Sequence, residues 1–294
     1  MKLTISDLNK TYKNGVKALN KIDLEIGTGM FGLLGPNGAG KSTMMRTIAT
    51  LQDPDSGSIF LDEIDVLNDN QALRRVLGYL PQEFGVYPDV SALDLLHYFA
   101  SLKGIGSKKD RTKIVDYVLD ITNLTDVRRR HVSGFSGGMK QRFGIAQMLL
   151  NDPQLIIVDE PTAGLDPAER KRFLNILREI SHGHIVIFST HIVEDVKELC
   201  TDMAIMNQGS ILLREAPNAA AEKLKGNIWT KRITGDVAEI VNTYNLISSS
   251  YNPDNSINIR VFSDSKPENG FSVVDPSLED VYFYHLNEES AVIA

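Results

Sequence analysis

The chain has one cysteine, one tryptophan and no run of eighteen apolar residues in its 294 positions. A single thiol cannot form an internal disulfide and fits a reducing compartment, so we expect Cys200 to be a packed helix residue. A helix that crosses a bilayer needs about 20 consecutive apolar residues, and none is expected here. Polar residues interrupt the first fifteen positions, where a secretion signal needs an apolar stretch. We therefore expect the protein to stay in the cytoplasm.

Positive charge is also scarce. The sequence has 31 Lys and Arg residues against 38 Asp and Glu residues, which gives a formal net charge of −7. Proteins that bind nucleic acids usually carry a basic face that neutralises phosphates, so no nucleic acid partner is expected. A composition with 42% hydrophobic and 23% charged residues is ordinary for a soluble protein. The length suits one large domain, or one domain with an appendage.

Apolar and polar residues alternate near the amino terminus, as in half-buried antiparallel strands. A fully apolar strand is expected at 30–34, followed by a glycine-rich turn and a helix. Two β-branched runs, 155–158 and 185–188, predict parallel strands buried on both faces. The fold class is therefore α/β with an antiparallel β subdomain. The apolar positions behind these expectations are Leu3, Ile5, Leu8, Ile22, Leu24 and Ile26 in the strands, and Met44, Met45, Ile48 and Leu51 in the helix.

Patterns in the middle and at the end of the chain predict a helical segment and a small accessory region. Apolar residues recur at helical spacing between Ser91 and Lys103, with Ser91 and Asp94 as a capping pair and Gly104 as terminator. The pattern changes near Gly226, where we expect a domain boundary. Residues 226–294 then form a small α+β accessory region that includes a strand at 257–261.

A glycine-rich run connects the apolar strand at 30–34 to the next helix. Its sequence is Gly35-Pro36-Asn37-Gly38-Ala39-Gly40-Lys41-Ser42. The run fits the phosphate-loop pattern in full, in the strand-to-helix context that the mechanism needs. Backbone N–H groups of the loop would surround the phosphates, and Lys41 would reach the β and γ phosphates. Ser42 would hold Mg²⁺. The helix from Thr43 would direct its positive end at the anion. Kinases, GTPases, helicases and motors share this loop, so it predicts only a nucleotide.

Two acids end the strand at 155–158. Asp159 suits Mg²⁺, and Glu160 suits the activation of the attacking water. The alternative is that the pair caps the next helix, but two buried carboxylates without a cation would be costly.

A serine and two glycines begin a later helix, within the run Phe135-Ser136-Gly137-Gly138-Met139-Lys140-Gln141-Arg142. This run resembles the signature motif of ATP-binding-cassette (ABC) proteins, usually leucine-serine-glycine-glycine-glutamine. The hydroxyl of Ser136 and the bare backbone N–H groups at Gly137 and Gly138 would form a second anion site. The resemblance implies that this site serves the γ phosphate of ATP held by an opposite subunit. Met139 stands where glutamine is more common, which leaves the role of that side chain open.

Four smaller matches follow from the same resemblance. Gln82 resembles the glutamine that touches the metal or water. A loop that crosses a dimer interface is matched by Ala163-Gly164-Leu165-Asp166. Asp166 could also be only the N-cap of a helix at Pro167. His191 resembles the switch histidine that senses the γ phosphate, with helix capping as the alternative. Tyr12 resembles the aromatic that stacks on adenine, with surface packing as the alternative.

The resemblance covers residues 1–225 and implies an ATP- and Mg²⁺-dependent hydrolase with a helical subdomain at about 83–150. Two cassettes, either copies of this chain or homologues, would pack around two ATP molecules and drive a separate transmembrane permease. The chain would then lie on the inner face of the membrane only through that permease. A non-transport ABC ATPase acting on ribosomes or DNA is the first alternative, and a small-molecule kinase is the second.

Three segments give expectations about contact with the permease and about the direction of transport. Glu83 to Gly104 carries Phe84, Val86 and Tyr87, which would either receive a helix of the permease or pack locally. The run 128–130, three arginines, is either a solvated charge cluster or a contact near that interface. Residues 276–282 resemble the closing stretch of cassettes from export systems, which implies an exporter.

Overall fold

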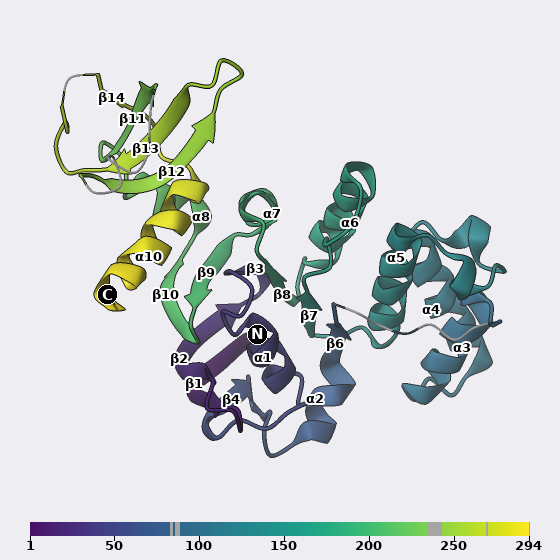
Figure 1. Ribbon diagram of the computed structural model, residues 1–294. Helices are drawn as coiled ribbons and strands as arrows, with labels where there is room; N and C mark the ends of the chain where they lie inside the picture. Colours follow the sequence, from purple (N-terminus) through teal and green to yellow (C-terminus); the bar gives the residue numbers. More distant parts are fainter. Residues whose placement is uncertain (83–84, 86–88, 235–242, 269, 294) are drawn as a thin grey trace.

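The computed structural model describes residues 1–82, 85, 89–234, 243–268 and 270–293, arranged around three β-sheets (Figure 1). An antiparallel sheet has the order β2-β1-β4-β5, and a six-stranded sheet has the order β10-β9-β3-β8-β7-β6. A third sheet near the carboxyl end has the order β12-β13-β11-β14. The α/β fold class expected from the sequence is confirmed.

The antiparallel sheet confirms the alternation of the first residues. Leu3 pairs with Ile26 and Ile5 with Leu24, and these side chains are buried on one face of the sheet. That face covers the phosphate-loop side of the parallel sheet, in one core with Phe31. The strands are β1 (Lys2–Thr11), β2 (Lys17–Gly27), β4 (Ser56–Leu61) and β5 (Ile64–Asp65).

The six-stranded sheet is parallel except for its edge strand β10. Strands β6, β7 and β8 lie side by side in register, with Val158 opposite both Leu80 and Phe188. Since parallel strands end at one edge, the segments that follow these strands and β3 are brought together there. The strands are β3 (Gly29–Leu34), β6 (Leu77–Leu80), β7 (Leu155–Asp159), β8 (Ile185–Thr190), β9 (Asp202–Asn207) and β10 (Ser210–Glu215).

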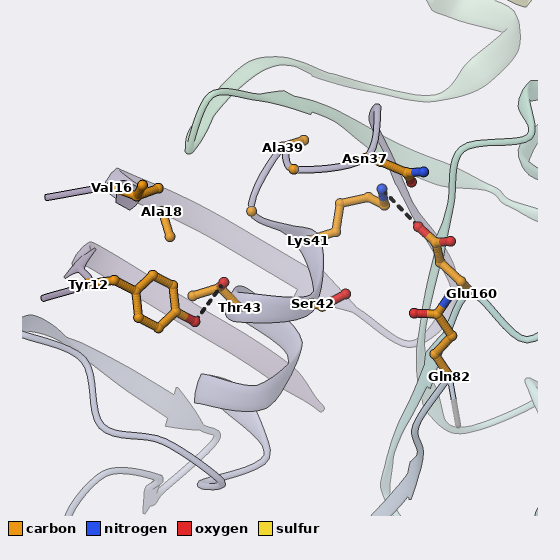
Figure 2. A pocket seen from close by; sticks show the side chains of 12 residues that line it. Tyr12, Val16, Ala18, Asn37, Ala39, Lys41, Ser42, Thr43, Gln82 and Glu160 are labelled. Atoms are coloured by element: carbon orange, nitrogen blue, oxygen red, sulfur yellow. Dashed lines mark hydrogen bonds and ion pairs between the residues drawn. The ribbon is translucent and has the colours of Figure 1, made fainter. Parts of the chain in front are cut away.

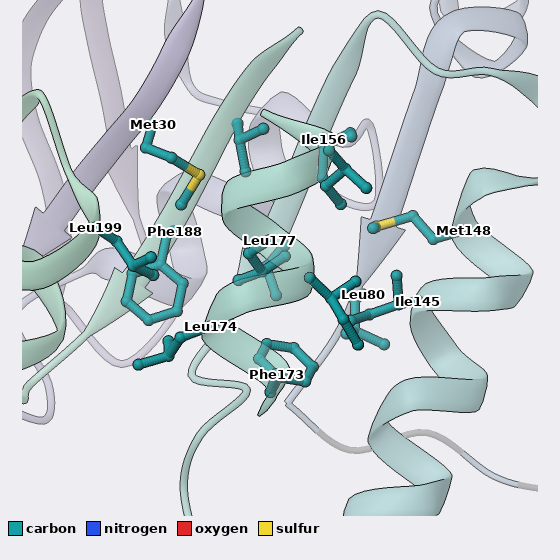
Figure 3. Packing of buried hydrophobic residues seen from close by; sticks show 14 of the residues in the cluster. Met30, Leu80, Ile145, Met148, Ile156, Phe173, Leu174, Leu177, Phe188 and Leu199 are labelled. Atoms are coloured by element: carbon teal, nitrogen blue, oxygen red, sulfur yellow. The ribbon is translucent and has the colours of Figure 1, made fainter. Parts of the chain in front are cut away.

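Helices cover both faces of the parallel sheet. Figure 3 shows Phe173, Leu174 and Leu177 of α6 against Ile156 and Phe188 of the sheet. Apolar residues at helical spacing therefore bury one side of α6, which is the main source of its stability. The helices are α1 (Lys41–Ile48), α2 (Asn70–Val76), α6 (Pro167–Ile180), α7 (Val193–Leu199) and α8 (Pro217–Glu222).

Two expectations for the first helix are wrong. It begins at Lys41 rather than Thr43, because Gly40 adopts a left-handed φ of 109° and lets the chain turn into the helix earlier. It ends at Ile48, and Thr50 has a positive φ of 57°, so Leu51 leaves the helix and is 55% exposed. Cys200 is buried as expected, and burial raises the pKa of its thiol, but it follows the last residue of α7 with an extended backbone and is not a helix residue.

A helical unit lies between β6 and β7, at the right of Figure 1. Ser91 caps the expected helix by accepting from the Asp94 N–H at 3.1 Å, and its own hydroxyl donates to the Asp94 carboxylate at 2.6 Å. The bounds 83–150 of a helical subdomain stay a prediction. The helices are α3 (Ala92–Leu102), α4 (Lys108–Ile121) and α5 (Gly137–Met148), with single 3-10 turns at Thr125–Val127, Val132–Gly134 and Leu149–Asn151.

The third sheet begins at Ile228, two residues after Gly226, where the sequence predicts a domain boundary. That boundary stays a prediction. It is joined to the rest of the chain by apolar packing, because Leu224, Val281 and Tyr282 belong to the same buried cluster as Leu199 of α7. The elements are β11 (Ile228–Ile233), β12 (Asn245–Tyr251), β13 (Ile257–Phe262), β14 (Ser272–Val273) and α10 (Leu278–Ile293).

A buried ion pair fixes the start of α10 to this sheet. Asp280 is 1% exposed, and its carboxylate accepts two hydrogen bonds from Arg260 of β13, at 2.6 and 2.7 Å. The N–H and hydroxyl of Ser277 also donate to it, each at 2.7 Å. Residues 276–282 therefore form a helix start held by a charge on the neighbouring strand.

Truncation of Arg260 should reveal the contribution of this pair. Arg260→Ala leaves a buried carboxylate without its cation and should lower the free energy of unfolding by about 3 kcal/mol. Lys225→Ala, just before β11, breaks an ion pair with Glu222 in which both side chains are more than half exposed, and should lose less than about 1 kcal/mol. Urea unfolding followed by fluorescence of Trp229, the single tryptophan, measures both. Equal losses in the two variants would contradict this account.

Candidate active site

A pocket of about 470 Å³ opens at the edge where β3, β6 and β7 end (Figure 2). Many of the side chains predicted from the phosphate-loop and acidic motifs share it. Gly35, Pro36, Asp159 and His191 adjoin the pocket without lining it. The lining residues are Tyr12, Val16, Ala18, Asn37, Gly38, Ala39, Gly40, Lys41, Ser42, Thr43, Gln82 and Glu160.

Two loop glycines are required by close backbone approach. A Cβ on Gly35 would lie 2.2 Å from the carbonyl oxygen of Met206, and one on Gly40 would lie 2.3 Å from that of Ala18. Gly40 also has φ of 109°, a conformation that L side chains rarely adopt. The loop is thus held tightly between β9 and β2, with the amino end of α1 directed into the pocket.

Lys41 lies at the centre of the site and is only 3% exposed. Its ammonium donates to the carbonyl oxygens of Gly35, at 2.8 Å, and Pro36, at 3.1 Å. The same ammonium lies 3.1 Å from a carboxylate oxygen of Glu160 (Figure 2). Burying a cation is costly unless it is paired, and here an anion and two backbone dipoles offset that cost.

Glu160 joins this lysine to the segment that follows β8. Its second carboxylate oxygen lies 3.3 Å from Nδ1 of His191. The Glu160 N–H donates to the hydroxyl and the carbonyl oxygen of Ser189, at 3.1 and 3.2 Å. Glu160 has a φ of 44°, which is uncommon for a residue with a side chain and persists only where neighbours enforce it. The predicted base, switch histidine and loop lysine are therefore in one contact chain.

Asp159 faces the loop serine. The hydroxyl of Ser42 donates to the Asp159 carboxylate at 3.3 Å, and that of Ser189 donates to the same oxygen at 2.5 Å. Burial, together with the charge of Asp159, raises the pKa of Tyr79 to about 12. A hydroxyl and one carboxylate suit a Mg²⁺ ion that takes its other ligands from water and phosphate. Among the described residues no three His, Cys, Asp or Glu side chains gather as a metal site.

Tyr12 follows the end of β1, at the other end of the pocket from Glu160 (Figure 2). Its hydroxyl lies 3.1 Å from the Thr43 hydroxyl and donates to Gln52 at 3.2 Å. Sequence reasoning missed Gln52, and it missed Val16 and Ala18 in the lining. The Asn14-Gly15 pair was an available signal, because it is a typical hairpin turn that folds Val16 back beside Tyr12.

The signature residues do not line this pocket. Ser136 is the N-cap of α5 and accepts from the Met139 N–H at 3.3 Å. Ser136 and Gly137 are exposed, and a Cβ on Gly137 would meet nothing within 4 Å. Gly138 is buried against Glu169 of α6, and Met139 lies half-buried against the core. The amino end of α5 is therefore an open surface of this chain.

Asp166 is the N-cap of α6. Its carboxylate accepts from the N–H groups of Ala168 and Glu169, at 3.0 and 2.9 Å. The capping alternative is thus present in the structure, while the dimer role stays a prediction. In the arginine run, Arg128 pairs with Asp116 at 2.6 Å, and Arg129 and Arg130 are exposed.

Comparison with known sequences gives a consistent family. The sequence model described as ABC transporter matches residues 19–163. "Probable multidrug ABC transporter ATP-binding protein YbhF" of Escherichia coli is 34% identical over 76% of this chain, and the chain spans only 39% of that protein. "Uncharacterized ABC transporter ATP-binding protein YxlF" of Bacillus subtilis is 34% identical, over 78% of this chain and 75% of its own length. "Methionine import ATP-binding protein MetN" of Helicobacter hepaticus is also 34% identical, over 72% and 62%.

Solved structures agree with the sequences. The structure of cbiO1 from Clostridium perfringens, described as part of the ABC transporter complex cbiONQ, has a TM-score of 0.69 and 28% identity, over 75% of this chain and 91% of that one. A dimeric post-hydrolysis state of the ATP-binding cassette MJ0796 bound to ADP and Pi has a TM-score of 0.66 and 27% identity, over 73% and 98%.

The two signature glycines should respond differently to a methyl group. Gly138→Ala places a Cβ 2.4 Å from the Glu169 carboxylate, whose partners Arg142 and Arg172 limit its movement, so about 1–3 kcal/mol of stability should be lost. Gly137→Ala meets open space and should change stability by less than about 0.5 kcal/mol. Thermal unfolding followed by circular dichroism measures both, and equal melting temperatures would contradict the packing described here.

Proposed function

This chain belongs to the ABC transporter family as an ATP-hydrolysing cassette, and we propose that two such cassettes pack around two Mg-ATP to drive a separate permease. The observation that carries the proposal is the separation of two anion sites within one chain. The pocket holds the phosphate loop, and the signature residues Ser136 and Gly137 lie outside it and are exposed, with open space around Gly137. A second cassette, either a copy or a homologue, would bring its signature to the phosphate of this one.

The pocket residues suit hydrolysis of ATP. Backbone N–H groups of the loop 35–42 and Lys41 bind the phosphates, and Tyr12 stacks on the adenine at the far end. Glu160 takes the proton of a water whose oxygen bonds to the γ phosphorus, while the bond to the β-γ bridging oxygen breaks and releases ADP and Pi. Ser42, Asp159 and Gln82 would hold Mg²⁺, which when bound neutralises charge on the phosphates.

The ion pair of Lys41 and Glu160 implies that ATP binds before Glu160 can act as the base. In the present arrangement the carboxylate neutralises the buried ammonium. Phosphate oxygens would replace it, so the arrival of ATP frees Glu160 to face a water. His191, 3.3 Å from Glu160 and partly exposed, then lies where it contacts both the base and the γ phosphate.

A groove beside the pocket suits the permease. Two hollows of about 200 and 400 Å³ share the lining residue Lys103, and the smaller reaches Pro81, which precedes Gln82. Burial lowers the pKa of Lys103 to about 8. An amphipathic cytoplasmic helix of the permease is the proposed occupant, because the groove adjoins the segment that also reaches the nucleotide. The expected contacts Phe84, Val86 and Tyr87 lie outside the described residues.

Export is the proposed direction. Relatives of equal identity are named for multidrug transport and for methionine import, so the direction rests on residues 276–282, which resemble the end of export cassettes. In the described part of the chain no helix is long and apolar enough to cross a membrane. We propose a cassette at 1–225 and an accessory region at 226–294, attached to the inner face of the membrane through the permease.

The carboxylate of Glu160 is the first point to test. Glu160→Gln removes the proton acceptor and retains the side-chain volume, so ATP turnover should fall at least about 100-fold while ATP binding remains. The variant should also trap a dimer in ATP. Phosphate release and size-exclusion chromatography with ATP measure these effects. Full turnover would contradict the role of Glu160.

The second site is tested by Ser136→Arg, which should abolish turnover and the ATP-dependent dimer but keep ATP binding by the monomer. Ser133→Arg, an exposed change three residues earlier, is the matched control and should retain activity. A small-molecule kinase with a complete site in one chain would keep its activity in both variants.

The groove is tested by Gln147→Arg, which fills the smaller hollow. The wild type should co-purify with a polytopic membrane protein from detergent extracts of its host, and this variant should bind ATP but lose the partner. Tyr98→Arg, on an exposed position of α3 outside both hollows, should keep it. Recovery of no polytopic protein with the wild type, or of ribosomes or DNA instead, would contradict the transport role.

A further inference from the structure

Asp195 is a buried carboxylate that the proposed chemistry does not use. It lies on α7, four residues after His191, and it is 1% exposed. One of its oxygens accepts from the Thr162 hydroxyl at 2.9 Å. The other accepts from Nε of Arg170 at 2.8 Å and forms an ion pair with the same guanidinium, whose Nη2 lies 2.7 Å away. A buried anion with two hydrogen-bond donors, one of them a cation, is strongly fixed in position.

The two partners of Asp195 stand at the two ends of one loop. Thr162 lies two residues after Glu160, and Arg170 lies in the first turns of α6, after its N-cap Asp166. Between them, Ala163, Gly164 and Asp166 are exposed, and Gly164 has a φ of 75°. The loop that is expected to meet the second cassette is therefore held at both ends by one carboxylate on the helix behind His191.

This contact runs parallel to the one inside the site. Glu160 contacts His191 at 3.3 Å, and Thr162 contacts Asp195 at 2.9 Å, so the same two segments are joined twice. Thr162 and Asp195 do not line the pocket, and they have no direct part in holding nucleotide. Their effect on Glu160 and His191 must pass through the backbone of those segments.

We propose that Asp195 is a positioning residue for ATP hydrolysis: it clamps the loop 162–166 and the first turn of α6 to α7 and so sets the placement of Glu160 against His191. A movement of the exposed loop against a second cassette then shifts the base and the switch histidine together. The inference rests on the proposed function and adds residues that link the loop at the dimer interface to the catalytic pair.

Asp195→Asn and Thr162→Val test the clamp from its two sides. Asp195→Asn keeps the shape but removes the charge opposite Arg170, and Thr162→Val removes only the hydroxyl. Each should lower kcat for ATP by about 10- to 100-fold, because misplacement by a fraction of an ångström is costly in an oriented site. KM and the dissociation constant of a fluorescent ATP analogue should change less than about twofold, since the pocket is unchanged.

Two controls separate positioning from stability. Thr162→Ser keeps the hydroxyl and should restore wild-type kcat. Glu194→Gln, on the neighbouring exposed position of α7, should leave kcat unchanged. Thermal unfolding of every variant identifies any that fail to fold, and Thr162→Val tests the clamp without placing a new polar group in the interior.

The outcomes are distinct. Wild-type kcat in folded Thr162→Val and Asp195→Asn would overturn the inference, and so would a rise in KM at unchanged kcat. A Thr162→Ser variant as slow as Thr162→Val would also overturn it, because the hydroxyl would then not be the active feature. A wild type without ATPase activity would instead overturn the proposed function, and the inference with it.

Discussion

The site depends on the parallel register of four strands. Strands β3, β8, β7 and β6 are hydrogen-bonded in that order, so the chain leaves each of them at the same edge of the sheet. Ser42 and Asp159, separated by 117 positions in sequence, meet there at 3.3 Å. Because the backbone bonds of the sheet set these positions, the residues after each strand are held in place before any ligand arrives.

Within that edge, charges rather than apolar contacts set the arrangement. Lys41 and Glu160 are both nearly buried, and each alone would be unfavourable in an interior of low polarity. Together, and with His191, they form a chain of contacts that keeps Glu160 in its uncommon backbone conformation. A phosphate is also an anion, so it could replace the carboxylate beside the lysine, as proposed above.

The sequence predicted those parts of the fold and the site whose pattern lies in consecutive residues. The loop 35–42, the acids Asp159 and Glu160, and the strands around them each carry their own pattern. Ser189, Gln52 and Asp195 could not be found this way, because their contacts depend on which strands and helices become neighbours. The error at Leu51 has a local cause: apolar spacing continued past Ile48, but a positive φ at Thr50 ended the helix.

The first turn of α6 connects the remaining motifs. Glu169 and Arg170 are consecutive, and successive helical residues project about 100° apart, so one turn reaches two neighbours. Glu169 lies 3.3 Å from Arg142 of the signature helix, while Arg170 binds Asp195 behind His191. Gly138 has no side chain where Glu169 approaches, which brings α5 and α6 close together. The first turn of α6 is therefore joined to α5 and to α7 by one largely buried ion pair each, and separating either pair would leave an ion uncompensated.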